Sequence, residues 1–302
     1  MPGARIIRSR LGFGERLARI WQYRELLLGM VRKELKVKYK NSVLGFAWSL
    51  LNPLLYLVVF YIAFDKILGT NIDAFPIFLL SGLLVWNLFS AGLGAATASV
   101  VGNAGIVNKV SFPREILPLA AIGGALVHFF LQGVVLVLAL LVARWDVAWT
   151  YLPLVPVALV GLLLLAAALG ILLSAVNVYL RDTQHFLELA LLAWFWMTPI
   201  VYGFMTLGSR GGWGKVVWMA NPVTPVVLVF QRALYARLST DAGPAAGGGA
   251  LRNVTTASDI LPDWTWSEHL AYLGLTFGVA VILLGVGVTV FGRLEANFAE
   301  EL

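Results

Sequence analysis

Apolar stretches of about twenty residues recur along the chain and alternate with short polar segments. A helix needs roughly 20 apolar residues to cross the hydrocarbon core of a bilayer, which is about 30 Å thick. The pattern therefore predicts an all-α, polytopic membrane protein with six transmembrane helices. These predicted spans lie near Leu44–Phe64, Phe75–Ser99, Ile116–Val142, Leu152–Tyr179, Phe186–Met205 and His269–Phe291.

A seventh apolar stretch, Val216–Leu234, is interrupted by Asn221-Pro222-Val223-Thr224-Pro225. Each proline removes an amide donor and breaks the helix, and broken backbone is tolerated at membrane depth only where it is buried in protein or lines a wet cavity. Two interpretations are open, a kinked helix that spans the membrane and a re-entrant helical hairpin. We favour the hairpin, over about residues 206–235, because six spans place most Lys and Arg residues on one side.

The first 43 residues form a separate, basic segment. They carry eleven Lys and Arg residues against three Glu residues. Positive charge before the first span holds that side in the cytoplasm, so both termini of a six-span chain are expected to be cytoplasmic. The first long apolar run begins only near Leu44, which argues against a cleaved signal peptide.

Within this segment, Glu15–Lys38 has the spacing of an amphipathic helix that lies at the membrane interface. Such a helix can serve as a topology signal and phospholipid anchor, and it can also receive an anionic substrate head group. The cations expected at this substrate entry are Arg32, Lys33, Lys36 and Lys38. The chain thus divides into an interface segment (1–43), a transmembrane domain (44–292) with a Gly-rich external loop at about 236–268, and a cytoplasmic tail (293–302).

The composition supports a location in lipid and limits the kinds of reactive site that the chain can contain. Of the 302 residues, 60% are hydrophobic and 13% charged, against about 25% charged in soluble domains. The absence of cysteine excludes disulfides and thiolate metal ligands. Ser209 stands where a phosphate-binding loop ending at Lys215 needs its first glycine, and Val216 stands where it needs Ser or Thr. We therefore predict no catalytic residue, metal site or cofactor in this chain.

The three histidines lie in separate segments and lack the spacing of a zinc site. His128 falls in the middle of a span, where an ionisable residue is a functional candidate. A neutral histidine that is hydrogen-bonded between helices is the interpretation we favour. No acidic pair shares a span, so paired acid and base catalysis has no obvious carriers.

Five local patterns stand out against the apolar background. They are Lys38–Gly45 leading to Leu51-Asn52-Pro53-Leu54, Asn103–Pro118, Asn177–Asp182, Trp196–Tyr202 and Asn221–Pro225. Together they closely resemble the permease subunits of type 2 ABC exporters for polysaccharides, the group that moves O-antigen, teichoic acid, capsule and galactan. The resemblance covers about Trp21–Phe291, nearly the whole chain.

The resemblance implies a homodimer of six-span permeases with two copies of a separate cytoplasmic ATPase, which would hold ATP and magnesium. It implies no nucleic acid partner. A coupling helix at about 103–115 would seat in the ATPase, and a charged pair after the fourth span would make a second contact. The residues that carry over to this contact are Asn103, Asn108, Lys109, Phe112, Pro113, Arg114, Glu115, Arg181 and Asp182.

Sugars are polar but have flat C–H faces, so aromatic rings suit the lining of a glycan channel. Aromatic residues near span ends are more often interfacial belts, which directs attention to rings inside the first and fifth spans. The resemblance adds Thr198-Pro199 at the outer channel end. The expected lining is Tyr56, Tyr61, Trp194, Trp196, Thr198, Pro199 and Tyr202.

The leading hypothesis is the channel-forming permease of an ATP-driven exporter that moves a lipid-linked polysaccharide (galactan, O-antigen or teichoic acid) across the bacterial inner membrane. One alternative is a permease that exports drugs or small lipids, although Thr206–Glu268 is too short and Gly-rich for the extracellular domain of those relatives. The other alternative is a membrane glycosyl- or acyltransferase, which needs carboxylates or histidines grouped at one depth.

Overall fold

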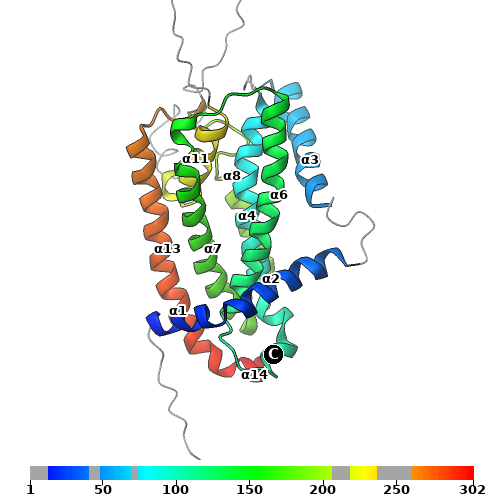
Figure 1. The fold of residues 1–302 in the computed structure, drawn as a ribbon, viewed down its shortest axis with the longest axis vertical. Coiled ribbons are helices and arrows are strands. Elements are labelled where there is room, and N and C mark those ends of the chain that lie inside the picture. Colours follow the sequence, from blue (N-terminus) through cyan, green and yellow to red (C-terminus); the bar gives the residue numbers. More distant parts are fainter. Residues whose placement is uncertain (1–12, 41–47, 70–71, 73, 206–217, 237–259) are drawn as a thin grey trace, which may run out of the picture.

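The computed structural model describes residues 13–40, 48–69, 72, 74–205, 218–236 and 260–302, and this part of the chain contains helices and no strand. Four helices are long and apolar enough to cross a membrane: α4 (Phe75–Gly102), α6 (Ile116–Val142), α7 (Leu154–Tyr179) and α13 (Trp266–Leu294). They stand side by side in one bundle, in which α7 packs against α4 and α13 while α4 packs against α6 (Figure 1). Each agrees within three residues with a predicted span.

Short helices cover the two ends of this bundle. At one end, called the α2 end below, α1 (Phe13–Gln22) and α2 (Arg24–Tyr39) lie across the bundle near α5 (Ala104–Val107) and α14 (Phe298–Glu301) (Figure 1). The opposite end, called the η3 end, carries the short helix η3 (Trp149–Tyr151). The helix predicted for Glu15–Lys38 is thus divided at Tyr23, and the predicted coupling segment is helical only over α5 before Pro113 and the start of α6.

The two remaining predicted spans are shorter in the structure. The first is α3 (Trp48–Phe60), continued by the π-helix η2 (Tyr61–Ile67), while the residues at 41–47 lie outside the described part. The other is α8 (Thr183–Trp196), which ends well before the predicted Met205. The helix stops because Pro199 has no amide proton to continue the ladder, and the Thr198 hydroxyl bonds back to the Trp194 carbonyl at 2.8 Å.

The interrupted seventh stretch contains α11 (Thr224–Leu234), which begins inside the Asn221–Pro225 break. It packs against α4, α7 and α13, and every residue of α11 except Leu234 is buried. The Ala148 amide donates to the Ala233 carbonyl at 2.9 Å, so the helix ends beside η3. The first arm of the predicted hairpin, at 206–217, and the Gly-rich loop at 237–259 lie outside the described residues.

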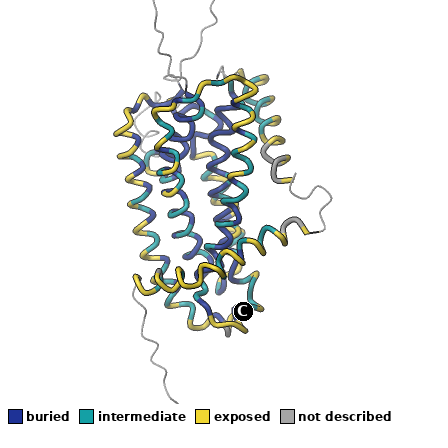
Figure 2. Tube along the Cα trace, in the orientation of Figure 1, coloured by how far each residue is buried: buried dark blue, intermediate teal, exposed yellow. Residues whose placement is uncertain are grey.

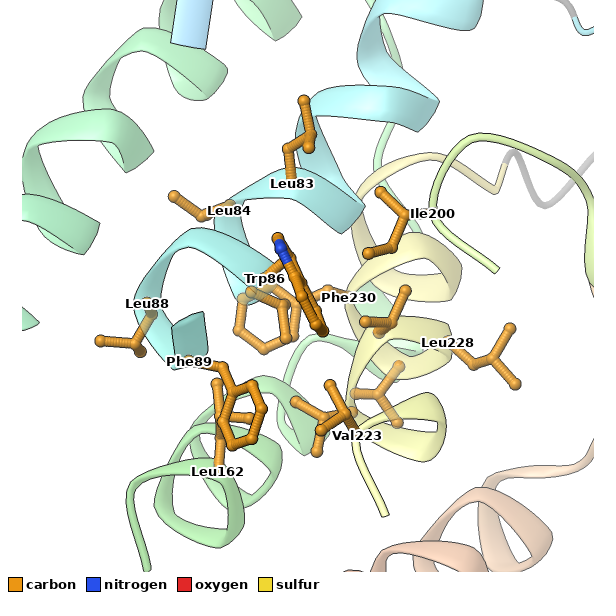
Figure 3. Close-up of a cluster of buried hydrophobic side chains, with 14 of the residues drawn as sticks. Leu83, Leu84, Trp86, Leu88, Phe89, Leu162, Ile200, Val223, Leu228 and Phe230 are labelled. Atoms are coloured by element: carbon orange, nitrogen blue, oxygen red, sulfur yellow. The ribbon is translucent and has the colours of Figure 1, made fainter. Parts of the chain in front are cut away.

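The hydrophobic core lies where α4, α7 and α11 meet. Phe89 from α4, Leu162 from α7 and Phe230 from α11 are almost completely buried there, and Figure 3 shows their side chains pointing toward one another. Figure 2 shows the same concentration of buried residues at the centre of the bundle.

Large apolar side chains also cover the outside of the bundle. Phe130, Leu138 and Leu141 on α6 and Ile282 on α13 are all more than half exposed. An apolar exterior on helices of this length is stable in hydrocarbon but not in water. Together with four helices of spanning length, it makes the chain a multi-pass membrane protein.

Close helix contacts depend on glycines at specific places. A Cβ atom at Gly287 of α13 would lie 2.9 Å from the Ala168 carbonyl oxygen of α7, and one at Gly170 would lie 2.8 Å from the Ala96 Cβ atom of α4. Gly274 and Gly278 of α13 have the GxxxG spacing that is typical of close helix contacts. Within this chain they make no such contact, because Cβ atoms there would meet nothing within 4 Å.

Gly287→Val is expected to lower the thermal unfolding midpoint of the purified protein, because the new side chain must displace the backbone of α7. Overpacking of this kind costs about 1–3 kcal/mol. Gly274→Val, a substitution in open space on the same helix, is the matched control and should leave the midpoint unchanged. Equal midpoints for the two variants would contradict the close packing of α13 on α7.

Candidate functional site

A cavity of about 890 Å³ lies between α3, α4, α6 and α8. Its size is typical of ligand pockets in proteins. Its wall contains residues from each of the four helices, and it is partly open rather than fully enclosed. The lining residues are Trp48, Leu51, Leu55, Tyr56, Phe60, Leu83, Trp86, Asn87, Leu88, Ser90, Ala91, Ala125, His128, Phe129, Gln132, Glu188, Leu191, Leu192, Phe195 and Trp196.

Aromatic rings form a continuous series along one wall of this cavity. The Tyr56 ring stacks on Phe60 with centroids 6.1 Å apart, and Phe60 contacts Phe195 of α8 at the same separation. Phe195 in turn meets Trp86 of α4 edge-on at 5.6 Å and Trp196 at 5.5 Å. The wall presents ring faces and edges that can contact the C–H groups of a passing molecule.

Only part of the predicted channel lining reaches this cavity. Tyr56 and Trp196 line it and are about half exposed. Tyr61 lies outside it, where its ring contacts the Lys66 ammonium at 5.1 Å. Phe195, another ring of the fifth predicted span, also lines the cavity. Phe60 and Trp86 are lining aromatics that the sequence did not indicate, because their orientation depends on how α3, α4 and α8 pack.

The other predicted lining residues hold the end of α8 in place. Asn221 is the centre of this arrangement: its side-chain oxygen accepts from the Trp194 indole at 2.7 Å and from the Val223 amide at 2.9 Å. Its side-chain nitrogen donates to the Thr198 hydroxyl at 2.8 Å. The proline break before α11 is therefore linked to the end of α8 by side-chain hydrogen bonds.

Pro199 and Pro222 take part in the same arrangement through their carbonyl groups. The Gln231 side-chain amide of α11 donates to the Pro199 carbonyl at 3.1 Å, and the Thr276 hydroxyl of α13 donates to the Pro222 carbonyl at 2.8 Å. Pro225 is buried at the start of α11. Tyr202 donates from its hydroxyl to the Trp196 carbonyl.

Amide side chains interrupt the apolar wall of the cavity between α4 and α6. The Asn87 side-chain amide of α4 donates to the Gln132 side-chain oxygen of α6 at 3.2 Å. His128 also lines the cavity one helical turn before Gln132. Of these three residues, the sequence indicated only His128 as a functional candidate. Asn87 and Gln132 are also polar residues within apolar runs, but their pairing can be recognised only once α4 and α6 are known to be neighbours.

The loop between α5 and α6 is the centre of the contacts at the α2 end. Glu115, 5% exposed, accepts from the Arg16 guanidinium of α1 at 2.6 Å. Arg114 donates to the Glu295 carbonyl at 2.6 Å and lies over the Phe298 ring. This loop therefore joins the N-terminal helix to the segment after α13.

The other residues predicted to contact an ATPase differ in exposure. Asn103 is half-buried and accepts from the Lys33 ammonium of α2 at 2.6 Å. Phe112 is buried, Pro113 is half-buried, and Asn108 and Lys109 are exposed. Arg181 and Asp182 are exposed between α7 and α8. Exposed loop residues beside a buried anchor form a surface on which another protein can dock.

The predicted substrate-entry cations lie on α2. Arg32, Lys33 and Lys36 are exposed, while the side chain of Lys38 is outside the described set. The helix that carries them packs against α6, and a Cβ atom at Gly123 of α6 would lie 2.7 Å from a Val31 methyl group. The cations therefore lie on a helix that packs against α6, and α6 also lines the cavity.

Comparisons with known proteins agree with this architecture. A family model described as "ABC-2 type transporter" matches residues 25–235. The O-antigen export system permease protein RfbA of Myxococcus xanthus is 34% identical over 226 residues, 74% of this chain and 86% of the relative. A protein of the same name from Klebsiella pneumoniae is 26% identical over 278 residues, 92% of this chain and 95% of the relative.

A more distant relative is the polysialic acid transport protein KpsM of Escherichia coli, which is 22% identical over 209 residues, 67% of this chain and 78% of the relative. The family match extends from α2 to the end of α11. It therefore includes the four helices of the cavity, the proline break and the loop at the α2 end. The chain belongs to the ABC-2 type transporter family.

Proposed function

We propose that this protein is the channel-forming permease subunit of an ATP-driven exporter that moves a lipid-linked polysaccharide across the bacterial inner membrane. The observation that carries the proposal is that the similarity to the polysaccharide permeases includes the helices that build the aromatic cavity. A cavity with a series of aromatic rings suits a polymer that has polar edges and C–H faces. The permeases that export drugs or small lipids, and the membrane transferases, gain no support from these relatives.

The proposed assembly is a homodimer with two cytoplasmic ATPase subunits that supply ATP and magnesium. We assign the α2 end to the cytoplasm, because the basic residues of α1 and α2 lie there and positive charge is retained on that side. Both described termini of the chain lie at this end (Figure 1). The exposed Asn108 and Lys109 would then face the ATPase.

Movement of the loop before α6 would reach the cavity through α6 itself. Glu115 lies at the start of α6, whose later residues line the cavity, so a push on the loop tilts one cavity wall. The ion pair to Arg16 and the Arg114 bond to the Glu295 carbonyl couple that push to α1 and to the end of α13. In this scheme, ATP-driven closure of the two ATPase subunits supplies the energy that moves the loop.

The topology can be tested directly because the chain contains no native cysteine. In intact cells, Asp263→Cys is expected to react with a membrane-impermeant maleimide. Asn108→Cys and Leu302→Cys should react only after permeabilisation. Labelling of Leu302→Cys in intact cells would place the C-terminus outside and refute the even number of crossings.

Depletion of the protein is expected to leave a lipid-linked glycan on the cytoplasmic face, because synthesis continues while export stops. Mass spectrometry of extracted lipids measures this accumulation, and purification of the tagged chain tests for an ATPase that is isolated with it. Normal lipid-linked glycan levels after depletion, with no ATPase in the purified material, would count against the proposal.

Arg16→Glu is expected to lower export severalfold, because it places two carboxylates together at a nearly buried position. Removing one partner of a buried ion pair lowers the free energy of unfolding by about 3–5 kcal/mol. The loss is smaller here, because the Arg16 side chain is partly exposed. The double exchange Arg16→Glu with Glu115→Arg should restore most of the export, measured as surface glycan. Arg19→Glu, an exposed residue of the same helix, is the control. Export equal to wild type in Arg16→Glu would remove this ion pair from the coupling scheme.

A further inference from the structure

Three polar residues of the cavity wall, Asn87, His128 and Gln132, lie close to the middle of their helices. Asn87 is near the centre of α4, and His128 and Gln132 are near the centre of α6. For helices that cross a bilayer, this places them far from both aqueous surfaces. Polar side chains at this depth are costly unless they are paired or serve a function.

Two other amides that tie transmembrane segments together in this protein are buried. Asn177 donates to the Thr97 carbonyl and Gln231 donates to the Pro199 carbonyl, and both residues are 0% exposed. Asn87 and Gln132 are different, because both are partly exposed and both line the cavity. A helix-tying role accounts for the first two, while the second two also face a space that another molecule can enter.

The Asn87–Gln132 hydrogen bond uses only part of the capacity of the two amides. One donor of Asn87 and one lone pair of Gln132 are used. A carbonyl oxygen on one residue and an NH₂ group on the other are left for a ligand. If both amides are turned around, the same two kinds of group are left on the opposite residues. In either orientation the pair presents one acceptor and one donor group to the cavity.

A donor and an acceptor beside aromatic rings match the chemistry of a sugar ring. A hydroxyl group both donates and accepts, and the C–H face of the sugar can lie against an aromatic ring. Trp86 stands one residue before Asn87, and the Phe195 ring meets it. We propose that Asn87, His128 and Gln132 form a hydroxyl-binding station in the cavity wall, which holds uncharged sugar units of the exported glycan. This proposal rests on the proposed function.

The charge of the cavity defines the class of glycan. Its lining residues, all within the described part of the chain, include no Lys or Arg, and Glu188 is the one acidic member. A second copy of the chain would contribute the same set. A polymer with a phosphate or carboxylate on each unit would bring these anions into an apolar wall without a matching cation, which is strongly unfavourable. The station therefore selects glycans with uncharged repeats over polyanionic ones.

The first test is the composition of the lipid-linked glycan that accumulates after depletion. Mass spectrometry is expected to show neutral sugars throughout the repeating unit, apart from the phosphate of the lipid carrier. A uronic acid, a sialic acid or a phosphodiester in every repeat would overturn the inference about charge. That result would leave the proposed function intact, because accumulation itself supports export. No accumulation at all would instead remove the proposed function.

The second test replaces the two amides with apolar side chains of similar size. Asn87→Leu with Gln132→Leu is expected to reduce export at least tenfold, with lipid-linked glycan accumulating as in depleted cells. Thr289→Val is the control, because this α13 residue bonds only to its own helix at Gly285 and lies outside the cavity. It should export normally. Wild-type export by the double variant would show that the amides do not bind the glycan.

A purely structural role of the amides predicts a different result. If they only tie α4 to α6, the loss of export must be matched by a lower thermal unfolding midpoint of the complex with its ATPase. The station predicts lost export with an unchanged midpoint. If the double variant does not accumulate as folded protein, Gln132→Met provides the same comparison with a smaller change. It should reduce export at least threefold at an unchanged midpoint, and unchanged export would overturn the proposal.

Discussion

The structure depends on the requirement that backbone polar groups inside hydrocarbon find partners within the protein. A continuous helix meets this requirement, but the two proline breaks, at Pro199 and at Pro222–Pro225, leave backbone groups without their usual partners in the helix. Side chains repair both: Asn221 bonds the Val223 amide, Gln231 bonds the Pro199 carbonyl, and Thr276 bonds the Pro222 carbonyl. Gln231 belongs to α11 and Thr276 to α13, so two of these bonds form only when the breaks are surrounded by the rest of the bundle.

The position of the cavity follows from these repaired breaks. Because α8 ends at Trp196 and α11 is buried against α4 and α7, the outer half of the bundle is filled by α11. The cavity forms beside this filled core, between α4 and the peripheral helices α3 and α8. Its wall is thus partly built from α4, the same helix that anchors the core. The cavity wall therefore combines the long central helix α4 with the shorter outer helices α3 and α8.

The sequence was sufficient to predict features that depend on local pattern. Apolar length located α4, α6, α7 and α13, and the prolines after Asn221 marked a break in the helix. The predicted fifth span ran past Pro199, whereas α8 ends at Trp196. Features that depend on tertiary contact were missed. Trp194 was expected in the channel but bonds Asn221, and Gly274 and Gly278 face open space although their spacing is that of a helix contact. The Asn87–Gln132 pair joins residues 45 positions apart, which no local pattern reveals.

The contacts of Arg114 and Glu115 also impose an order on biosynthesis. Glu115 pairs with a residue 99 positions earlier, whereas Arg114 bonds a carbonyl 181 positions later. During translation, the first contact becomes available as soon as the loop is made, but the second must wait until residue 295 has left the ribosome. The set of contacts that joins this loop to α1 and to the segment after α13 is therefore complete only after the last long helix has been synthesised.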